Sequence, residues 1–480
     1  MSGLDGIALA AAAVAVGAPL AAAAALRLGG DRLAPRGVAG AALGIVLGAT
    51  VAVAWCWHAG DGRTITWGDR LAGGSLVTID GLTALLMPFI AVVDLAILLA
   101  APRRALAPAG VARTLGGAAA TFAMLATAHP AALVVLWVAS STATYAAVRG
   151  TLGGRPTARV YALAVGTAVV LMAVGTALLV ADPPWLRAHG PVGAVGGWLV
   201  AVAVMIRKGL VPFHSWYPAL YTGGPLASAL AATMPQVASY TAVRLLVGHA
   251  DGVGPELVFL SNAALLTAAY GAALAVVQRD ARGLIGTLAM SQSAMVLAGI
   301  AATEPMELVG ALAVWVSSGL ALTGIGLVVW ALESRSGRIS IETLQGRFAD
   351  APALAAFFLL FGLASLGFPG TLSFVADDLI ISGALGDRTY AGVLVILTTV
   401  FAGIAVMRGW FRIFGGPVMV DAPRHSVLPR ERFVFTALLA ILFGLGLWPG
   451  PFVRSLGAVA TSLLAAPDTV PSHAPAGASP

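Results

Sequence analysis

Two adjacent cations occur at the end of an apolar run, where an ionic side chain is least expected. Lys208 is the only lysine in the 480 residues, and it follows Arg207 directly after the apolar segment 194–206. Prolines then interrupt the sequence PFHSWYP (Pro212–Pro218), and proline breaks a helix. A charge at the centre of a bilayer costs about 2.5–3.5 kcal/mol on insertion scales, so it needs a function or a partner. The pattern fits an ion path; the alternative is that both cations anchor a helix end by snorkelling.

Three carboxylates and a further arginine are candidates for the same chemistry. Asp94 lies inside the apolar stretch FIAVVDLAILLA, and Asp377 and Asp378 follow a second interrupted stretch, ASLGFPGTLSF. Asp94 either faces a polar interior or is a neutral packing residue, and the two later aspartates either conduct or are solvated at a helix end. Arg408 is either a cation close to these two aspartates or a basic anchor at a helix end.

His214 and several neutral polar residues complete the candidate path. His214 lies inside the first interruption, where an imidazole either shuttles protons or caps the second half-helix. Arginine is effectively never deprotonated, whereas lysine can change its charge when desolvated, so we expect Lys208 to carry protons and Arg207 to be a fixed charge. Neutral side chains that either hold a file of water or serve helix packing are Ser140, Ser141, Thr142, Thr144, Gln236, Ser291, Gln292, Ser293, Ser317 and Ser318.

The composition is that of a polytopic α-helical membrane protein. Hydrophobic residues make up 59% of the chain and charged residues 10%, against about 25% charged residues in soluble domains. The net charge of +6 is explained by arginines in short loops that face an anionic leaflet, so it does not indicate nucleic-acid binding. A single cysteine, Cys56, and seven scattered histidines supply no metal or redox centre, and no phosphate-binding loop is present. We therefore expect a transport subunit without cofactors rather than an enzyme.

Fourteen apolar segments are long enough to cross a bilayer at roughly 20 residues per helix. They lie near 6–26, 38–58, 79–101, 114–128, 131–148, 159–181, 194–211, 226–247, 255–278, 284–302, 308–332, 352–374, 389–414 and 433–450. Alternating the loops between the two sides divides the 27 Lys and Arg residues 21 to 6. We expect the protein to lie in the cytoplasmic (inner) membrane. The positive-inside rule then places both termini on the outer side, away from the cytoplasm.

The two interrupted segments, 194–211 and 352–374, occupy corresponding places in two groups of five helices. Paired interruptions of this kind indicate an inverted-repeat transporter with its path at the breaks, although proline and glycine are also simply frequent in membrane helices. The predicted domains are 1–113 (three N-terminal helices), 114–250 and 251–415 (the two repeats), 416–466 (a C-terminal helix region) and 467–480 (a disordered tail).

The sequences around both interruptions resemble a known family. RKGLVPFHSWYPALYTGGPLASAL (Arg207–Leu230) and GLASLGFPGTLSFVADDLI (Gly362–Ile380) are similar to the helix 7 to 8 and helix 12 signatures of the antiporter-like membrane subunits of respiratory complex I and of Mrp antiporters, of the NuoM/MrpD type. Segment Arg279–Met295 falls where that family has helix 10. The resemblance implies a proton path through charged residues in mid-membrane, driven by partner subunits.

Only part of the family's charged path is kept. Arg207 stands where the family has its helix 7 lysine, and Asp377 stands where it has a helix 12 glutamate. Four other expected positions are neutral: Val138 replaces the helix 5 glutamate, Gln236 the helix 8 lysine, and Gln292 and Ser318 the histidines of helices 10 and 11. The loss of these groups indicates a divergent member, away from respiratory complex I itself.

The resemblance leaves two functional classes open. In the first, the chain is a proton-translocating or energy-coupling subunit of a larger membrane complex. A specific case is a bacterial inorganic-carbon uptake (DAB) complex, in which an antiporter-like subunit is paired with a soluble zinc protein resembling carbonic anhydrase and proton flow drives CO2 hydration there. In the second, the chain is a structural membrane subunit that has kept the fold and lost conduction.

Overall fold

Apolar segments with few charges fold as helices here because a helix satisfies its own backbone groups without water. A computed structural model describes residues 3–68, 74–151, 153–181, 191–247, 254–300, 305–417 and 426–464. The first part contains α1 (Gly3–Gly29), η1 (Gly30–Arg32), α2 (Pro35–Ala59), β1 (Ile65–Trp67), β2 (Val77–Ile79), α3 (Gly81–Ala100), η2 (Arg103–Ala105), α4 (Pro108–Leu125), α5 (Pro130–Arg149), α6 (Arg155–Ala181), α8 (Pro191–Lys208), α9 (Trp216–Gly223), α10 (Leu226–Thr233) and α11 (Val237–Leu246). The second part contains α12 (Pro255–Val276), α13 (Ala281–Ile300), α14 (Pro305–Ser336), α15 (Pro352–Ser365), α16 (Leu372–Asp387), α17 (Thr389–Phe414), α18 (Pro429–Leu447) and α19 (Pro449–Leu464).

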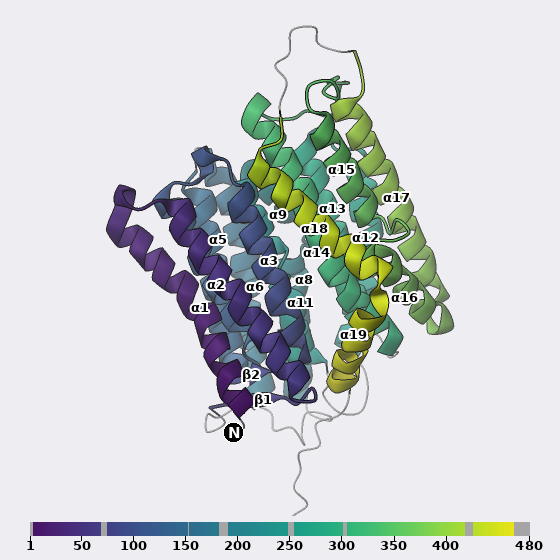
Figure 1. The fold of residues 1–480 in the computed structure, drawn as a ribbon. Helices are drawn as coiled ribbons and strands as arrows, with labels where there is room; N and C mark the ends of the chain where they lie inside the picture. Colours follow the sequence, from purple (N-terminus) through teal and green to yellow (C-terminus); the bar gives the residue numbers. More distant parts are fainter. Residues whose placement is uncertain are drawn as a thin grey trace, which may run out of the picture.

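The helices run side by side in one elongated bundle, with the N-terminus and α19 at the same end (Figure 1). Among the described residues, nine helices are long and apolar enough to cross a membrane, or ten if the bent pair α18 and α19 forms one span. The polytopic α-helical membrane class predicted from the sequence is confirmed. The only strands in the described ranges are β1 and β2, which pair antiparallel as a short hairpin.

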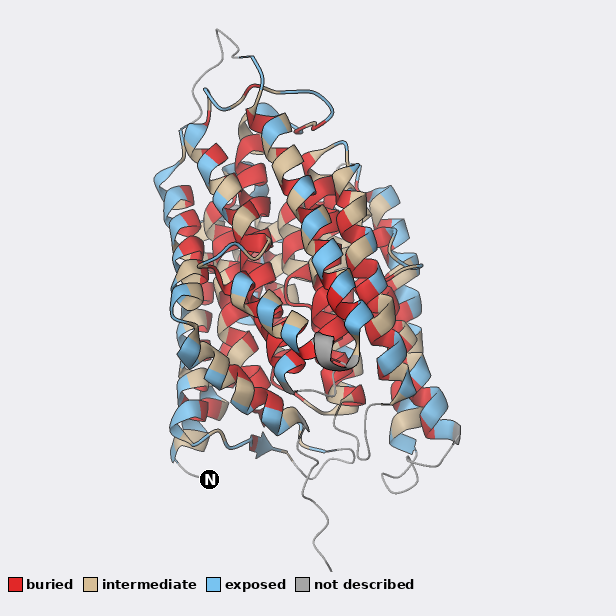
Figure 2. Cartoon of the chain, turned by 90° about the vertical axis from the view of Figure 1, so that its right-hand side faces the viewer, coloured by how far each residue is buried: buried red, intermediate tan, exposed pale blue. Residues whose placement is uncertain are grey.

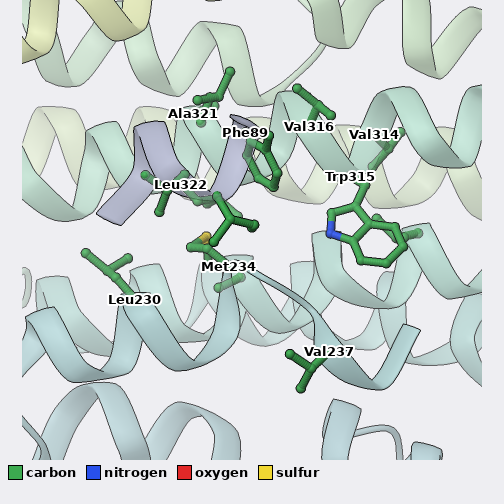
Figure 3. Packing of buried hydrophobic residues seen from close by; sticks show 14 of the residues in the cluster. Phe89, Leu230, Met234, Val237, Val314, Trp315, Val316, Ala321 and Leu322 are labelled. Atoms are coloured by element: carbon green, nitrogen blue, oxygen red, sulfur yellow. The ribbon is translucent and has the colours of Figure 1, made fainter. Parts of the chain in front are cut away.

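The most apolar stretches of α13 and α14 are 94% and 100% buried, whereas those of α5 and α6 are 28% buried. Helices α13 and α14 therefore form the centre of the bundle, and α5 and α6 lie at its surface; the buried residues fill the interior in Figure 2. Figure 3 shows the apolar packing where α3, α10, α11 and α14 meet, with Phe89, Leu230, Val237 and Trp315 among its side chains.

Each predicted segment overlaps one helix or a broken pair, but the count of fourteen spans stays a prediction, because nine or ten of the described helices are long and apolar enough to cross a membrane. Three boundaries differ from the prediction. Segment 226–247 is split between α10 and α11, segment 352–374 stops at Ser365 and continues as α16 to Asp387, and the last segment bends by 82° between α18 and α19. A proline lies at each break, Pro235, Pro369 and Pro449, and proline removes a backbone donor and clashes with the preceding turn. The domain boundaries and the repeats stay predictions, and segment 467–480 lies outside the described residues.

The two main breaks have the same backbone turn. Gly209 after α8 and Gly367 after α15 adopt positive φ angles of 66° and 71°, a left-handed conformation that glycine adopts without steric cost. The next residue in each case donates its backbone N–H to a carbonyl five residues earlier, Leu210 to Met205 at 2.9 Å and Phe368 to Leu363 at 3.2 Å. This is the Schellman motif, a common way for a helix to end. Both helices are therefore ended by the same local backbone motif.

Candidate functional site

Lys208 is the last residue of α8 and is almost completely buried, at 2% exposure. Its ammonium Nζ donates a hydrogen bond of 2.6 Å to Oε1 of Gln236. Gln236 sits between α10 and α11 with a left-handed φ of 48°, which is uncommon for any residue except glycine. The break after Pro235 therefore turns an amide oxygen toward the only lysine of the chain.

Arg207 is also buried, at 9% exposure, and its partners are neutral. Its guanidinium donates to the hydroxyl of Ser141, to Ser140 Oγ at 2.9 Å and to the carbonyl of Trp137 at 3.3 Å. It also lies over the Trp137 ring, 4.9 Å from the centroid, in a cation–π contact. Hydroxyls and a ring on α5 thus hold the cation where the family resemblance led us to look for a glutamate.

The groups freed at the break after α8 are satisfied by side chains. The N–H of Val211 donates to Thr267 Oγ1 on α12 at 3.0 Å, and Trp216 Nε1 donates to the carbonyl of Ile206 at 2.7 Å. Irregular backbone at membrane depth is tolerated where protein groups satisfy it in this way. The break is therefore a built feature of the fold that holds both cations in the interior.

Two small cavities meet at Arg207. One, of about 20 Å³, is lined by Lys208, Gln236, Tyr161, Thr233 and Ser293 together with Arg207. The other, of about 30 Å³, is lined by Asp94, Arg113, Ser140, Thr144 and Ser228 together with Arg207. A cavity needs roughly 10–15 Å³ and several polar partners to hold a water molecule. Each cavity is large enough for a water molecule and has several polar side chains in a lining that also contains apolar residues, so both spaces suit ordered water.

Asp94 lies in the middle of α3 at 7% exposure. Because it lines the same cavity as Arg207, the structure brings a carboxylate of α3 to the cavity beside the cation of α8. Asp94 therefore lines a cavity, and whether it has a role in proton movement stays a prediction. Arg207 lines one cavity with Asp94 and the other with Lys208 and Gln236.

The other predicted residues lie elsewhere. His214 packs edge-on against Tyr270 of α12, with ring centroids 5.0 Å apart, and its Nε2 is 3.4 Å from the tyrosine hydroxyl. Its side chain does not cap α9, since Ser215 is the residue at that position. Arg408 lies in the last part of α17 and donates to the carbonyl of Gln278 at 2.9 Å, so it occupies the anchoring position rather than pairing with an aspartate of the described chain.

Asp377 and Asp378 differ in their surroundings. Asp377 is partly buried and Asp378 is exposed. The carboxylate of Asp377 lies against Gly367, where an added Cβ would stand 2.6 Å from Oδ2. The acid of α16 therefore faces the backbone of the second break, while its neighbour points to the surface.

The neutral positions of the family pattern can also be placed. Val138 is 39% exposed on the surface of α5, next to the fully buried Trp137. From α13, the residue that lines the cavity of Lys208 is Ser293, one position after Gln292. Ser318 is buried in α14 at 2% exposure.

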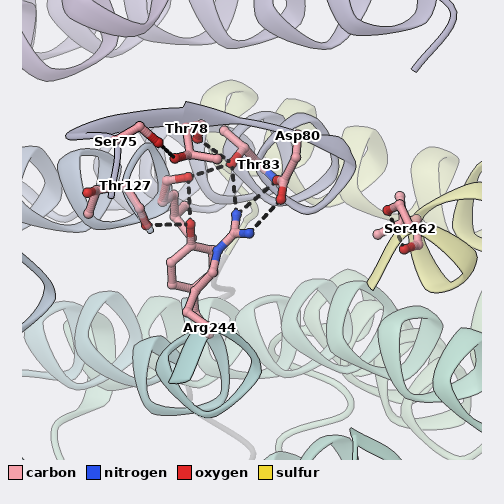
Figure 4. A network of polar contacts seen from close by, with 10 residues as sticks. Ser75, Thr78, Asp80, Thr83, Thr127, Arg244 and Ser462 are labelled. Atoms are coloured by element: carbon pink, nitrogen blue, oxygen red, sulfur yellow. Dashed lines mark hydrogen bonds and ion pairs between the residues drawn. The ribbon is translucent and has the colours of Figure 1, made fainter. Parts of the chain in front are cut away.

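A buried ion pair that no sequence pattern predicts joins α11 to the start of α3. Arg244 of α11 binds Asp80, which caps α3, with nitrogen–oxygen distances of 2.5 and 2.9 Å. Tyr240 stacks under this guanidinium at 4.8 Å and donates to the carbonyls of Leu125 and Thr127, both at 3.0 Å. Figure 4 shows this network, which joins the β hairpin, α3 and α11. The only sequence signal was an arginine near the end of an apolar segment.

Known proteins are similar to this chain in sequence and in fold. The family described as NADH:quinone oxidoreductase/Mrp antiporter, transmembrane, matches residues 131–402, more than half of the chain. The NAD(P)H-quinone oxidoreductase chain 4 of Acaryochloris marina is 30% identical over 291 residues, which cover 56% of this chain and 53% of that protein. The chain spans about half the length of the curated relatives it matches.

Solved structures are similar over nearly the whole chain. A chain of the Mrp complex from a Dietzia species superposes with a TM-score of 0.83 at 20% identity, covering 97% of this chain and 98% of that one. A chain of respiratory complex I from Thermus thermophilus superposes with a TM-score of 0.82 at 21% identity, covering 94% and 99%. These structures establish the fold, and the family match adds the sequence relationship. The chain belongs to the NADH:quinone oxidoreductase/Mrp antiporter transmembrane family.

Proposed function

We propose that this protein is a proton-translocating or energy-coupling membrane subunit of a multi-subunit complex. The observation that carries the proposal is that Arg207 lines two small cavities, one together with Asp94 and the other together with Lys208. Buried charges without a carboxylate partner are costly, so retaining two adjacent cations in this interior is best explained by a role in ion movement.

The residues have separate roles in this proposal. Asp94 and Lys208 are the groups that take up and release protons, through water in the two cavities. Arg207 keeps its charge and opposes the protonation of Lys208, because two like charges repel at short range. Gln236 offsets this repulsion, since its Oε1 accepts a hydrogen bond from Nζ at 2.6 Å. A change that alters the Gln236 contact would therefore couple proton movement to the conformation of the break at α10 and α11.

Asp377, with Asp378 beside it, is the candidate for the second half of the path. Asp377 lies against the second break, and His214 and Arg408 are proposed to act at the edges of the bundle. The path would join the two halves of the chain in the membrane, in a cytoplasmic-membrane protein with both termini outside. The other membrane subunits of the complex are the expected partners.

Inorganic-carbon uptake is the specific case that we propose. Here a soluble zinc protein resembling carbonic anhydrase is the partner, and the zinc belongs to that partner. In the described part of this chain, no group of three or more His, Cys, Asp or Glu side chains could hold a metal ion. Proton flow through this subunit would then drive CO2 hydration on the partner.

A structural subunit without conduction is the second candidate. It is favoured by the neutral residues at four family positions and by the apolar packing between α10, α11 and α14 (Figure 3). The two candidates differ in whether single charged residues matter for ion flux.

The test is proton flux in vesicles that contain the intact purified complex. Lys208→Met and Asp377→Asn are each expected to lower the flux by about tenfold or more, since a positioned proton-transfer group contributes about 10²–10⁴-fold. Glu342→Gln is the matched control, because that carboxylate is 55% exposed and lines neither cavity, and it should retain the flux. Unchanged flux in both variants would favour the structural candidate.

The carbon-uptake case has its own readout. The complex is purified through this chain, its soluble partner is identified, and the bound zinc is measured. A zinc-containing partner, together with loss of growth at low CO2 in the Lys208→Met strain, is expected. Carbon uptake would be contradicted if the chain co-purified with a quinone-reactive subunit, or with small membrane subunits alone. The proton path would then be tested by the flux measurement only.

A further inference from the structure

A large basic cavity lies at the end of the bundle opposite the N-terminus, where α3 and α14 end and α18 begins (Figure 1). Its volume is about 750 Å³, within the range of about 300–1,000 Å³ that is typical of small-molecule sites. Six arginines line it: Arg103, Arg104, Arg282, Arg335, Arg338 and Arg430. The proton path does not use this cavity.

Only part of this positive charge is neutralised by the protein. Two glutamates line the cavity, and each already has a partner: Arg282 binds Glu333 and Arg335 binds Glu431, both at 2.6 Å. The other four arginines, Arg103, Arg104, Arg338 and Arg430, form no ion pair within the described ranges of the chain. The cavity thus holds an excess of four positive charges.

These cations also crowd one another. The guanidinium of Arg36 is close enough to those of Arg430 and Arg103 to be repelled by both. Partial burial and then the charge of Arg282 lower the pKa of Arg338. The Nε of Arg430 is buried and has no hydrogen-bond partner among the described residues. A bound anion would relieve this repulsion and accept the missing hydrogen bond.

Phosphate oxygens are the anion that best matches several guanidinium groups, because arginine binds them with paired, charge-assisted hydrogen bonds. Basic pockets between membrane helices bind phospholipid headgroups. The cavity lies at headgroup level, because the apolar spans α3 and α14 end beside it.

An apolar surface continues from the cavity along α18. Leu428, 40% exposed, lines the cavity, and Phe433, 67% exposed, lies three residues after Arg430. Residues three apart share one face of a helix, so a cation at the cavity is followed by an exposed apolar side chain one turn further along. This order of charged and apolar groups matches a phosphate followed by acyl chains.

We propose that this cavity binds a phosphate group, carried by an anionic phospholipid whose acyl chains lie along α18. The bound phosphate would contact arginines at the ends of α3 and α14 and at the start of α18, and so link these three helices. It is independent of the proton path, so either proposal can fail alone.

The test measures the binding of short-chain phosphatidylglycerol to the purified complex in detergent, by native mass spectrometry. Removing Arg103 and Arg430 together (R103Q/R430Q) is expected to weaken binding by about fivefold for each arginine, the effect of one basic residue near an anionic surface. The matched control is R279Q, because Arg279 lies outside the cavity lining, is 84% exposed and pairs with Glu342. R103K/R430K keeps the charge but loses the paired hydrogen bonds, so its binding should lie between those of the unchanged protein and R103Q/R430Q. This variant keeps the proposal testable if R103Q/R430Q fails to fold.

Three further arms complete the experiment. Short-chain phosphatidylcholine should bind more weakly than phosphatidylglycerol. If inorganic phosphate binds as tightly as the lipid and R103Q/R430Q loses both, the phosphate site stands and its source is free phosphate. The proposal would be overturned if R279Q lost as much binding as R103Q/R430Q, or if R103Q/R430Q bound the lipid unchanged. It would also be overturned if polyglutamate, but not phosphate, displaced the lipid. That last result would assign the cavity to an acidic protein segment.

Discussion

The break after α8 and the break after α15 share a backbone turn and differ in the charges beside it. When the two are aligned on Gly209 and Gly367, Arg207 corresponds to Ser365 and Lys208 to Leu366. The first break therefore carries two cations on its incoming helix, and the second carries a carboxylate, Asp377, on its outgoing helix α16. The turn that ends a helix in the bundle and the charge placed at that turn are thus separate features of the sequence.

The two breaks also differ in how many helices contribute polar contacts to them. At the first, hydroxyl and amide groups from α5 and from the break at Gln236 hold the cations, and two cavities adjoin them. At the second, the hydroxyl of Ser365 donates to the carbonyl of Gly362 at 2.7 Å, within its own helix. The first break is a polar site built by several helices, and this contrast can be tested by substitution.

The largest expected effect concerns the anchor of the first break. The Asp80–Arg244 pair fixes α11, which begins next to Gln236, the partner of Lys208. Asp80→Asn should lower the free energy of unfolding by about 3–5 kcal/mol, the cost of breaking a buried pair. Glu342→Gln, which removes an exposed pair at 3.6 Å, should cost less than about 1 kcal/mol. Thermal unfolding in detergent measures both, and equal losses would contradict the assignment of a buried anchor.

The next largest effect concerns the hydrogen bonds made by Arg207 at the first break and by the corresponding Ser365 at the second. Replacing Ser140 and Ser141 by alanine leaves buried donors of Arg207 without acceptors, at about 1–3 kcal/mol. Ser365→Ala removes only a hydrogen bond within one helix and should change stability by less than about 0.5 kcal/mol, as for most substitutions without a special contact. The same unfolding measurement applies. A Ser365→Ala loss as large as that of the double variant would mean that the two breaks are alike.

The smallest effect tests what the two breaks share. Gly209→Ala and Gly367→Ala should each cost at least about 1–2 kcal/mol, because a left-handed backbone is unfavourable for a residue with a Cβ. The added Cβ would also stand 2.8 Å from Tyr217 Cβ or 2.6 Å from Asp377 Oδ2, which adds to the cost. Gly40→Ala is the control: Gly40 lies inside α2 with no atom within 4 Å of an added Cβ, and alanine there should stabilise the helix by about 0.5–1 kcal/mol. Opposite signs in one unfolding assay are expected. A loss in only one of the two breaks would show that they do not share the turn.

The order of the spans and the breaks at Gly209 and Gly367 could be predicted because hydropathy and proline act locally along the chain. The apolar run 226–247 predicts one continuous helix, whereas the structure splits it at Gln236. Pro235 is the signal inside this run, because proline removes a backbone donor and breaks a helix.

The pairings within the site could not be read from the sequence. Asp80 and Arg244 are 164 residues apart, and Arg207 and Ser140 are 67 apart, so only the packed bundle brings them together. Family position pointed to a glutamate at Val138, which is absent, and the serines that hold Arg207 lie two and three residues later on α5. Asp94 could be singled out as a carboxylate in an apolar span, but its cavity shared with Arg207 depends on how α3, α5 and α8 pack.

The most direct test of the central claim is a double-variant comparison of proton flux in vesicles that contain the intact complex. Asp94→Asn, Lys208→Met and the two together are measured beside the unchanged protein, with Glu342→Gln, an exposed carboxylate outside the proposed path, as the control. If Asp94 and Lys208 serve one path through the first break, the double variant should be no slower than the slower single variant, since groups that act as a unit are not additive. Flux that stays at the level of the unchanged protein in all three variants, or independent losses that multiply in the double variant, would contradict this account.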